Sequence, residues 1–228
     1  MGGFRIAGRL GQGGQGIVYL GESPDGGRAA VKVMTGGIDR GFAREPAAAR
    51  KVDEFCTVRV LVADLDHDPP YVAGEYIDGP ALATAGPVRG AALTRLALGT
   101  VTALAAIHRA GVVHRDFKPG NVLLGPDGPR VIDFGIARLV DATSTRTYTS
   151  GTPPYMSPEQ LSGAEAGPTS DPFAWGSTMT FAGTGRPPFG WDRPPAARRA
   201  PPPAPSRRCS RPDPTGRRSR SRWRARSR

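Results

Sequence analysis

Apolar residues alternate with polar or small ones over most of the first 80 positions, which is the pattern of half-buried β-strands. Phe4, Ile6 and Leu10 lie on alternate positions, and a β-branched and aromatic run resumes the pattern at Ile17 after a glycine-rich stretch. We therefore predict a small sheet whose strands are separated by polar turns. The predicted strands cover residues 4–10, 17–20, 28–34, 57–61 and 71–76.

The pattern changes to helical spacing in the second part of the chain. Apolar residues recur every three or four positions and predict a long amphipathic helix that Gly111 ends. A hairpin is predicted after it, with residues 122–124 and 130–132 joined by the turn 125–128. The apolar stripe of the helix consists of Leu93, Leu96, Ala97, Val101, Leu104, Ala105 and Ile107.

Polar residues gather on the segment between that helix and the hairpin. Asp116, Lys118 and Asn121 place a carboxylate, an ammonium and a carboxamide within six positions, and a Pro-Gly pair bars the segment from continuing as helix. A carboxylate can orient and accept the proton of an attacking hydroxyl, and a lysine can neutralise a transferring phosphoryl group. The amide oxygen, together with Asp133, can hold magnesium. This inventory suits phosphoryl transfer.

Glycines stand at positions 11, 13 and 16, between two predicted strands. They allow backbone amides to approach phosphate oxygens closely. A dinucleotide-binding fold would require a helix directly after the glycines. The β-branched run from Ile17 to Leu20 excludes that alternative.

Taken in order, the motifs resemble those of the protein kinases, and most closely bacterial, actinobacterial-like serine/threonine kinases of the eukaryotic type. The resemblance implies an α+β, two-lobed fold with a small antiparallel-sheet N-lobe and hinge (residues 1–79). It also implies a mainly helical, partial C-lobe (residues 80–190) that ends after the segment Gly185–Gly190 and lacks the last helices. The motifs are Gly11–Val18, Ala30–Lys32, His114–Asn121, Asp133–Gly135, and Gly151–Thr152 followed by Ser157–Glu159.

The same resemblance assigns roles to individual residues, with ATP and Mg²⁺ as cofactors. Asp116, Lys118 and Lys32 are the expected catalytic residues, and Asn121 and Asp133 the expected metal ligands. The glycine at position 74 is expected to leave the back of the nucleotide pocket open. The expected nucleotide-binding residues are Leu10, Gly11, Gln12, Gly13, Gly14, Gln15, Gly16, Val18, Ala30, Lys32, Glu45, Glu75, Ile77 and Leu123.

Two positions depart from the family pattern. Pro46 directly follows Glu45, the expected partner of Lys32, so the regulatory helix is predicted to be short or to begin near Glu45. Asp171 precedes a proline and is predicted to cap a helix and to buttress the catalytic loop.

The implied activity is transfer of the ATP γ-phosphate to Ser or Thr hydroxyls of protein substrates, because Thr152 matches the serine/threonine class. Autophosphorylation is expected on the hydroxyl-rich segment 136–150, with Thr147 and Thr149 as acceptors and Arg115 as a phosphate partner. Self-association for this step is an open alternative. So is a truncated, inactive kinase fold that only binds nucleotide or a partner, and in which Glu159 lacks its usual arginine partner.

The charge of the chain, +11 at pH 7, resides entirely in residues 191–228, which hold thirteen arginines and two aspartates. This segment contains no Leu, Ile, Val, Phe or Met and is predicted to be disordered. Its composition is also typical of an out-of-frame reading of GC-rich coding sequence. Nucleic acid is not expected as a partner, because no basic-aromatic module accompanies the arginines.

Cys56 and Cys209 are the only cysteines, and they suggest neither a disulfide framework nor a zinc site. The sequence has no run of 18 apolar residues and no signal-peptide pattern at its start. We therefore expect a cytoplasmic protein without a membrane partner.

Overall fold

The computed structural model describes residues 2–14, 16–35, 57–134, 153–164 and 166–190. All of them belong to one compact unit, Met1–Ala197. The predicted basic tail, residues 191–228, lies outside the described residues, as does the region around Glu45.

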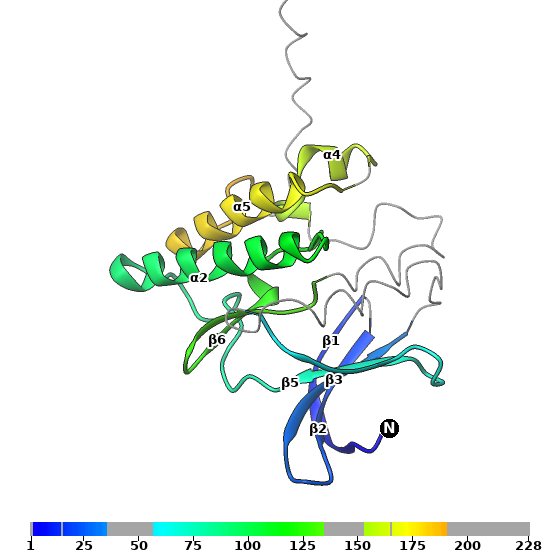
Figure 1. The fold of residues 1–228 in the computed structure, drawn as a ribbon. Helices are drawn as coiled ribbons and strands as arrows, with labels where there is room; N and C mark the ends of the chain where they lie inside the picture. Colours follow the sequence, from blue (N-terminus) through cyan, green and yellow to red (C-terminus); the bar gives the residue numbers. More distant parts are fainter. Residues whose placement is uncertain (1, 15, 36–56, 135–152, 165, 191–228) are drawn as a thin grey trace, which may run out of the picture. The chain divides into compact units, whose positions relative to one another are not determined.

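The first part of the described chain forms a five-stranded antiparallel sheet, as predicted (Figure 1). Neighbouring strands pair in the order β1-β2-β3-β5-β4. The strands are β1 (Arg5–Gly13), β2 (Gly16–Glu22), β3 (Arg28–Met34), β4 (Val60–Asp64) and β5 (Tyr71–Glu75).

The fourth strand begins three residues later than predicted, and the prediction that it starts at Thr57 is wrong. Thr57 instead forms an isolated bridge with Val131, and the Val58 N–H donates to the Val131 carbonyl at 3.1 Å. The extended chain before β4 therefore pairs with a hairpin of the second part of the chain. A strand pattern cannot distinguish these two pairing partners, because both satisfy the same backbone groups.

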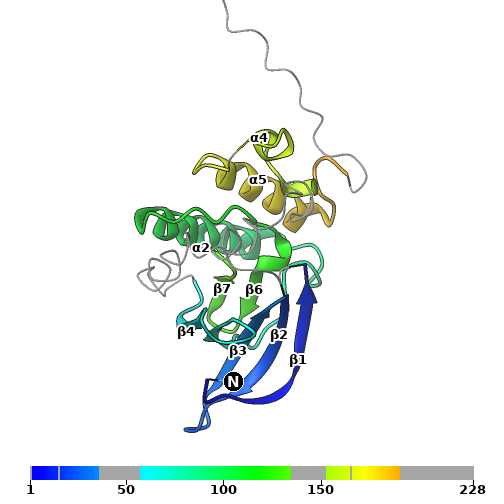
Figure 2. The same ribbon diagram turned by 90° about the vertical axis from the view of Figure 1, so that its right-hand side faces the viewer.

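The two faces of the sheet have different roles. Val31 and Val33 on β3 belong to a buried cluster with Tyr71 and Ala73 of β5. Lys32, between them, points to the opposite face, as strand alternation predicts, and lines a cavity there. Figure 2 shows the hairpin β6–β7 between this sheet and helix α2.

The second part of the chain is mainly helical, and α2 and α5 lie side by side in both ribbon views (Figures 1 and 2). The Trp175 indole Nε1 of α5 donates to the Thr100 hydroxyl of α2 at 3.0 Å. Here the elements are α2 (Gly90–Arg109), β6 (Val122–Gly125), β7 (Gly128–Val131), α4 (Pro158–Leu161), α5 (Ser170–Thr184) and the 3-10 turns Pro119–Asn121 and Pro153–Tyr155. Their shared core contains Leu82, Leu96, Ala103, Leu104, Ala106, Ile107, Val112, Phe117, Val122, Val131, Phe134, Ala174 and Ala182.

Helix α2 confirms the predicted amphipathic helix, but its buried stripe is rotated from the predicted one. Val101, which the sequence placed in the stripe, is 43% exposed. Leu98, which was not in the predicted stripe, is 61% exposed. Thr100 takes a buried position instead, because its hydroxyl donates back to the Leu96 carbonyl at 2.8 Å and is thereby satisfied. By length and composition alone, α2 is also apolar enough to cross a membrane.

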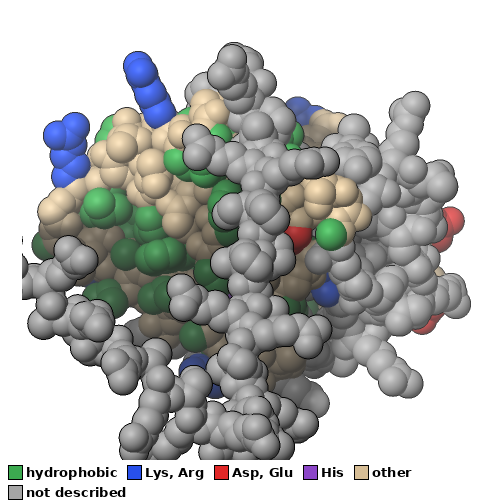
Figure 3. Space-filling model, turned by 90° about the horizontal axis from the view of Figure 1, so that it is seen from above, with side chains coloured by type: hydrophobic (Ala, Val, Ile, Leu, Met, Phe, Trp, Pro, Cys, Tyr) green, Lys and Arg blue, Asp and Glu red, His purple; other side chains and the backbone are tan. Residues whose placement is uncertain are grey.

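Viewed from the helical side (Figure 3), hydrophobic side chains lie between stretches of backbone and other side chains over the visible part of the described surface.

Helix α5 begins at Ser170, one residue before Asp171, which was predicted to be its N-cap. Thr169 occupies the N-cap position, Ser170 is the first helical residue, and Asp171 lies in the first turn. The prediction that Asp171 caps the helix is therefore wrong. Its carboxylate is used by backbone groups of another segment, as described below.

Candidate active site

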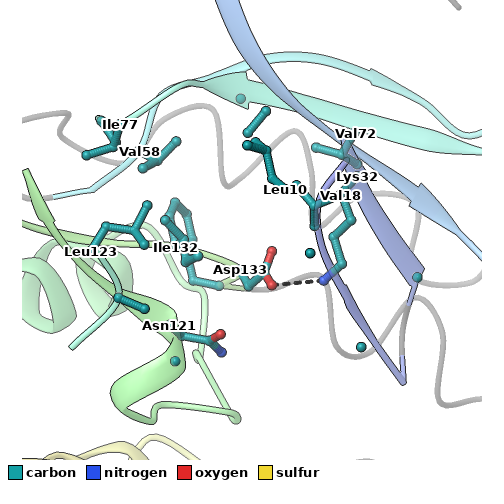
Figure 4. A pocket seen from close by; sticks show the side chains of 18 of the residues that line it. Leu10, Val18, Lys32, Val58, Val72, Ile77, Asn121, Leu123, Ile132 and Asp133 are labelled. Carbon is teal, nitrogen blue, oxygen red and sulfur yellow. Dashed lines mark hydrogen bonds and ion pairs between the residues drawn. The ribbon is translucent and has the colours of Figure 1, made fainter. Parts of the chain in front are cut away.

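A cavity of about 690 Å³ lies between the face of the sheet that carries Lys32 and the loop that follows α2. Sixteen described residues were predicted as catalytic, nucleotide-binding or metal-binding, and all of them line this cavity. They are Leu10, Gly11, Gln12, Gly13, Gly14, Gly16, Val18, Ala30, Lys32, Glu75, Ile77, Asp116, Lys118, Asn121, Leu123 and Asp133. Figure 4 shows the inward-pointing side chains, including Leu10 and Val18 from the sheet and Leu123 from β6.

The glycine-rich stretch forms the tight turn between β1 and β2, where Gly13 pairs with Gly16. Gly16 has a positive φ of 152°, and a Cβ at this position would overlap the Val33 carbonyl oxygen. Only glycine fits here. A Cβ added at Gly11 or Gly13 would meet nothing within 4 Å, so at these positions the missing side chains leave open space at the cavity rim.

Lys32 and Asp133 form an ion pair inside the cavity, with Nζ 3.0 Å from Oδ2 (Figure 4). The lysine side chain is 9% exposed and the aspartate side chain 28% exposed. Lys32 pairs with Val18 of β2 and Val72 of β5 in the sheet register, which fixes its position on the central strand. A buried ammonium beside a partly exposed carboxylate suits the binding of phosphate and a cation.

Asp116 and Lys118 form the second charged pair of the cavity, with Nζ 2.7 Å from Oδ2. The Asn121 amide Nδ2 donates to the Asp116 carbonyl at 2.8 Å, and the Asp116 N–H donates to the His114 carbonyl at 2.9 Å. These bonds hold the loop as a compact turn. The Asp116 carboxylate thus has a defined position with an adjacent cation.

Asp171 buttresses this loop, as predicted. One of its carboxylate oxygens accepts the His114 N–H and the other the Arg115 N–H, both at 2.8 Å. The His108 Nε2 lies 2.7 Å from the first of these oxygens. The Asp171 side chain is 1% exposed, so the loop is held by a buried, fully engaged carboxylate.

His114 is fully buried, and neither of its ring nitrogens has a hydrogen-bond partner among the described residues. Burial lowers the pKa of this imidazole below its usual value of 6.5, against the opposing effect of the carboxylates of Asp171, Asp116 and Asp133. The ring packs edge-on against Phe117, with centroids 5.3 Å apart. His114 is therefore a neutral core residue under the catalytic loop.

The oxygen atoms of Asn121 and Asp133 fit a Mg²⁺ site. The Asn121 amide nitrogen is engaged by Asp116, which leaves the amide oxygen as the atom to meet a cation. Asp133 supplies a carboxylate to the same cavity (Figure 4). Magnesium prefers a small number of such oxygen ligands together with substrate phosphates.

The cavity also contains residues that the sequence did not single out, namely Val58, Val60, Val72, Ala81 and Ile132. The signal for Val72 was present in the sequence. It stands two positions before Gly74 on β5 and therefore shares its face. The others depend on how β4 and the hairpin approach the sheet.

Gly74 lines the cavity, but the space beside it is not empty. A Cβ at this position would lie 3.1 Å from Val58 Cγ1 and 3.3 Å from the Arg59 carbonyl oxygen. The opening expected at the back of the pocket is therefore partly filled by Val58.

Glu159, for which no arginine partner was foreseen, accepts a hydrogen bond from the Ser170 hydroxyl at 2.6 Å. Burial alone would raise the pKa of this carboxyl. Hydrogen bonds from Ser170, its own backbone and Ser157 outweigh that effect, so the pKa is lowered. Glu159 therefore stays ionised and links α4 to the start of α5.

Several predicted residues lie outside the described part of the chain. These are Gln15, Glu45, Thr147, Thr149 and Thr152.

Comparison with known proteins shows the family of the chain. The protein kinase domain family matches residues 4–199, past the end at Gly190 that the motifs predict. The probable serine/threonine-protein kinase PkwA of Thermomonospora curvata is 48% identical over 202 residues, which cover 83% of this chain and 27% of that protein. The serine/threonine-protein kinase AfsK of Streptomyces coelicolor is 45% identical over 202 residues, covering 83% of this chain and 25% of that protein.

A more distant relative is the serine/threonine-protein kinase Pkn1 of Myxococcus xanthus, 37% identical over 205 residues, covering 82% of this chain and 30% of that protein. The chain thus spans about a quarter of the length of the curated relatives it matches. Among solved structures, the PknI kinase domain of Mycobacterium tuberculosis superimposes with a TM-score of 0.66 at 23% identity. That match covers 84% of this chain and 76% of the solved one.

Proposed function

The chain belongs to the protein kinase family, and from this premise we propose that it transfers the γ-phosphate of ATP to serine and threonine hydroxyls of proteins. One observation carries the proposal. The ion pairs Lys32–Asp133 and Asp116–Lys118 face the same cavity, together with Asn121 and the glycine-rich turn.

The apolar part of the cavity supports adenine binding. Val18 and Ala30 line it from the sheet, and Leu123 lines it from β6. Glu75 and Ile77 lie at the end of β5 and in the segment after it, where backbone N–H and C=O groups can bond the adenine edge. The phosphates would then extend toward the glycine-rich turn and Lys32.

The polar residues divide the chemistry between them. Asp116 orients the acceptor hydroxyl and takes its proton as the oxygen attacks the γ-phosphorus, and the bond to the β-phosphate oxygen breaks to release ADP. Lys118, 2.7 Å from Asp116, neutralises charge on the transferring group. Asp133 and Asn121 would hold Mg²⁺, which supplies charge neutralisation when bound.

Protein substrates with Ser or Thr acceptors are the proposed partners, and one of them can be a second copy of the chain. Autophosphorylation between copies would place acceptors such as Thr147 and Thr149 before Asp116. The need for ATP supports a cytoplasmic location.

The test is transfer of labelled γ-phosphate from Mg-ATP to the protein itself and to a generic basic substrate. We expect transfer by the wild type and a loss of at least about 100-fold in Asp116→Asn, because the proton acceptor is removed. A folded wild type that binds ATP without transfer would contradict the proposal and favour a nucleotide-binding function. Mixing Asp116→Asn with active protein tests whether one copy phosphorylates another.

A further inference from the structure

A contact between α4 and the catalytic loop is not explained by the functions described so far. The Gln160 amide Nε2 donates to the Arg115 carbonyl at 2.8 Å, across 45 positions of sequence. The oxygen of the same amide accepts the N–H and the hydroxyl of Ser157, both at 3.1 Å. Ser157 is fully buried, so both of these bonds are made to a residue that solvent does not reach.

The start of helix α4 explains only half of this arrangement. Ser157 and Gln160 form a capping box, in which the side chain of the third helical residue accepts the N–H of the N-cap. Glutamate serves this purpose as well as glutamine. A glutamate at this position, however, would turn a carboxylate oxygen toward the Arg115 carbonyl oxygen. An amide, unlike an ionised carboxylate, accepts from Ser157 and donates to Arg115 at the same time.

The position of the Arg115 carbonyl affects the position of Asp116. It belongs to the peptide group that joins Arg115 to Asp116, and Arg115 has a positive φ of 65°, which is uncommon for a residue with a side chain. Asp171 of α5 holds the Arg115 N–H. Gln160 of α4 holds its carbonyl. The two ends of one strained residue are thus fixed by side chains from two different helices.

We propose that Gln160 is a positioning residue for Asp116 and acts through the Arg115 carbonyl. This inference rests on the proposed kinase function. It makes α4 a support of the catalytic carboxylate through the peptide group that joins Arg115 to Asp116. Loss of the contact should lower kcat, because Asp116 is misplaced. It should leave the KM for ATP nearly unchanged, because the Gln160 side chain bonds Ser157 and Arg115 and does not line the cavity.

Two variants separate positioning from helix capping. Gln160→Met keeps the length of the side chain and removes both functions, and we expect kcat to fall about tenfold with the KM for ATP within about twofold. Gln160→Glu keeps the capping oxygen and removes only the donor to Arg115. Its activity relative to wild type should rise as the pH falls, because the protonated carboxyl again donates to the Arg115 carbonyl.

Ser162→Ala is the matched control beside α4, since Ser162 is exposed and its hydroxyl, among the described residues, donates to the Glu159 carbonyl. It should retain wild-type kinetics. A wild-type kcat in Gln160→Met, or a pH-independent activity ratio for Gln160→Glu, would overturn the proposal. An equal loss of kcat in Ser162→Ala would overturn it as well.

Hydrogen exchange of the catalytic-loop amides tests whether Gln160 holds the loop, and it does not require the protein to be active. Exchange at Arg115 and Asp116 should be faster in both Gln160 variants than in wild type and Ser162→Ala. Unchanged exchange would contradict the positioning role. If the wild type transfers no phosphate, the proposed function fails, while this measurement still tests the contact itself.

Discussion

Burial of His114 links the stability of the protein to pH. The unfolded chain binds a proton on this imidazole below about pH 6.5, its usual pKa. In the folded protein burial lowers that pKa, in spite of the neighbouring carboxylates, so the ring binds a proton less readily than in the unfolded chain. Because the unfolded state then binds more protons, the free energy of unfolding falls as the pH falls through the unfolded pKa.

The magnitude follows from the proton balance of one group. The upper limit is a ring that stays neutral in the folded protein over the whole interval. Protonation of the unfolded chain then removes about 0.2 kcal/mol at about pH 7 and about 1.4 kcal/mol at about pH 5.5. His114 alone should therefore contribute at most about 1.2 kcal/mol over this interval. Well above the unfolded pKa neither state binds this proton, and the loss of stability is absent.

His114→Phe removes the titrating group and keeps an aromatic ring beside Phe117. Urea unfolding at the two pH values should show that the wild type loses more stability than the variant, by up to about 1.2 kcal/mol. His67→Gln serves as the control for removing a histidine elsewhere, in the turn where His67 Nδ1 lies 2.7 Å from the Pro69 carbonyl. Identical pH dependence of wild type and His114→Phe would refute the reasoning.

Two further substitutions test the packing around the site. Asp171→Asn replaces a buried acceptor by an amide donor facing backbone N–H groups of the catalytic loop, and urea unfolding should show a loss of about 2–4 kcal/mol. Asp127→Asn, in the exposed hairpin turn, should change stability by less than about 0.5 kcal/mol, and an equal loss in both would contradict the assigned role of Asp171. Gly74→Ala should lower stability by about 1–2 kcal/mol, because the new Cβ meets Val58 and the Arg59 carbonyl. Adding Val58→Ala should restore part of this loss in the same unfolding assay, and strict additivity would argue against the contact.

Most of the site was predictable because its residues lie on short segments whose local conformation places them. Lys32 stands between two apolar residues of a strand, so alternation alone turns it to the pocket side. The glycines at 11, 13 and 16 lie between two strand patterns, which predicts a turn. Asp116, Lys118 and Asn121 share one short loop and therefore had to lie close together.

Other predictions failed where a residue had two acceptable local environments. Thr57 fits a strand of the sheet, but it bridges to β7 instead. Val101 fits the apolar stripe of α2, yet Thr100 is buried because a helix can satisfy its hydroxyl internally. Asp171 fits a helix cap, but two N–H groups of the catalytic loop engage it from another part of the chain.

The sequence by itself determined the strand order along the chain, the long helix and the identity of the charged cavity residues, because these follow from periodicity and from motifs of neighbouring residues. The family resemblance also predicted that Asp171 supports the catalytic loop. Only the tertiary structure showed which of its groups Asp171 bonds, and that Gln160 bonds Arg115 across 45 positions. Hydrogen bonds of that kind depend on how helices pack, and helix packing has no signature in the spacing of residues along the chain.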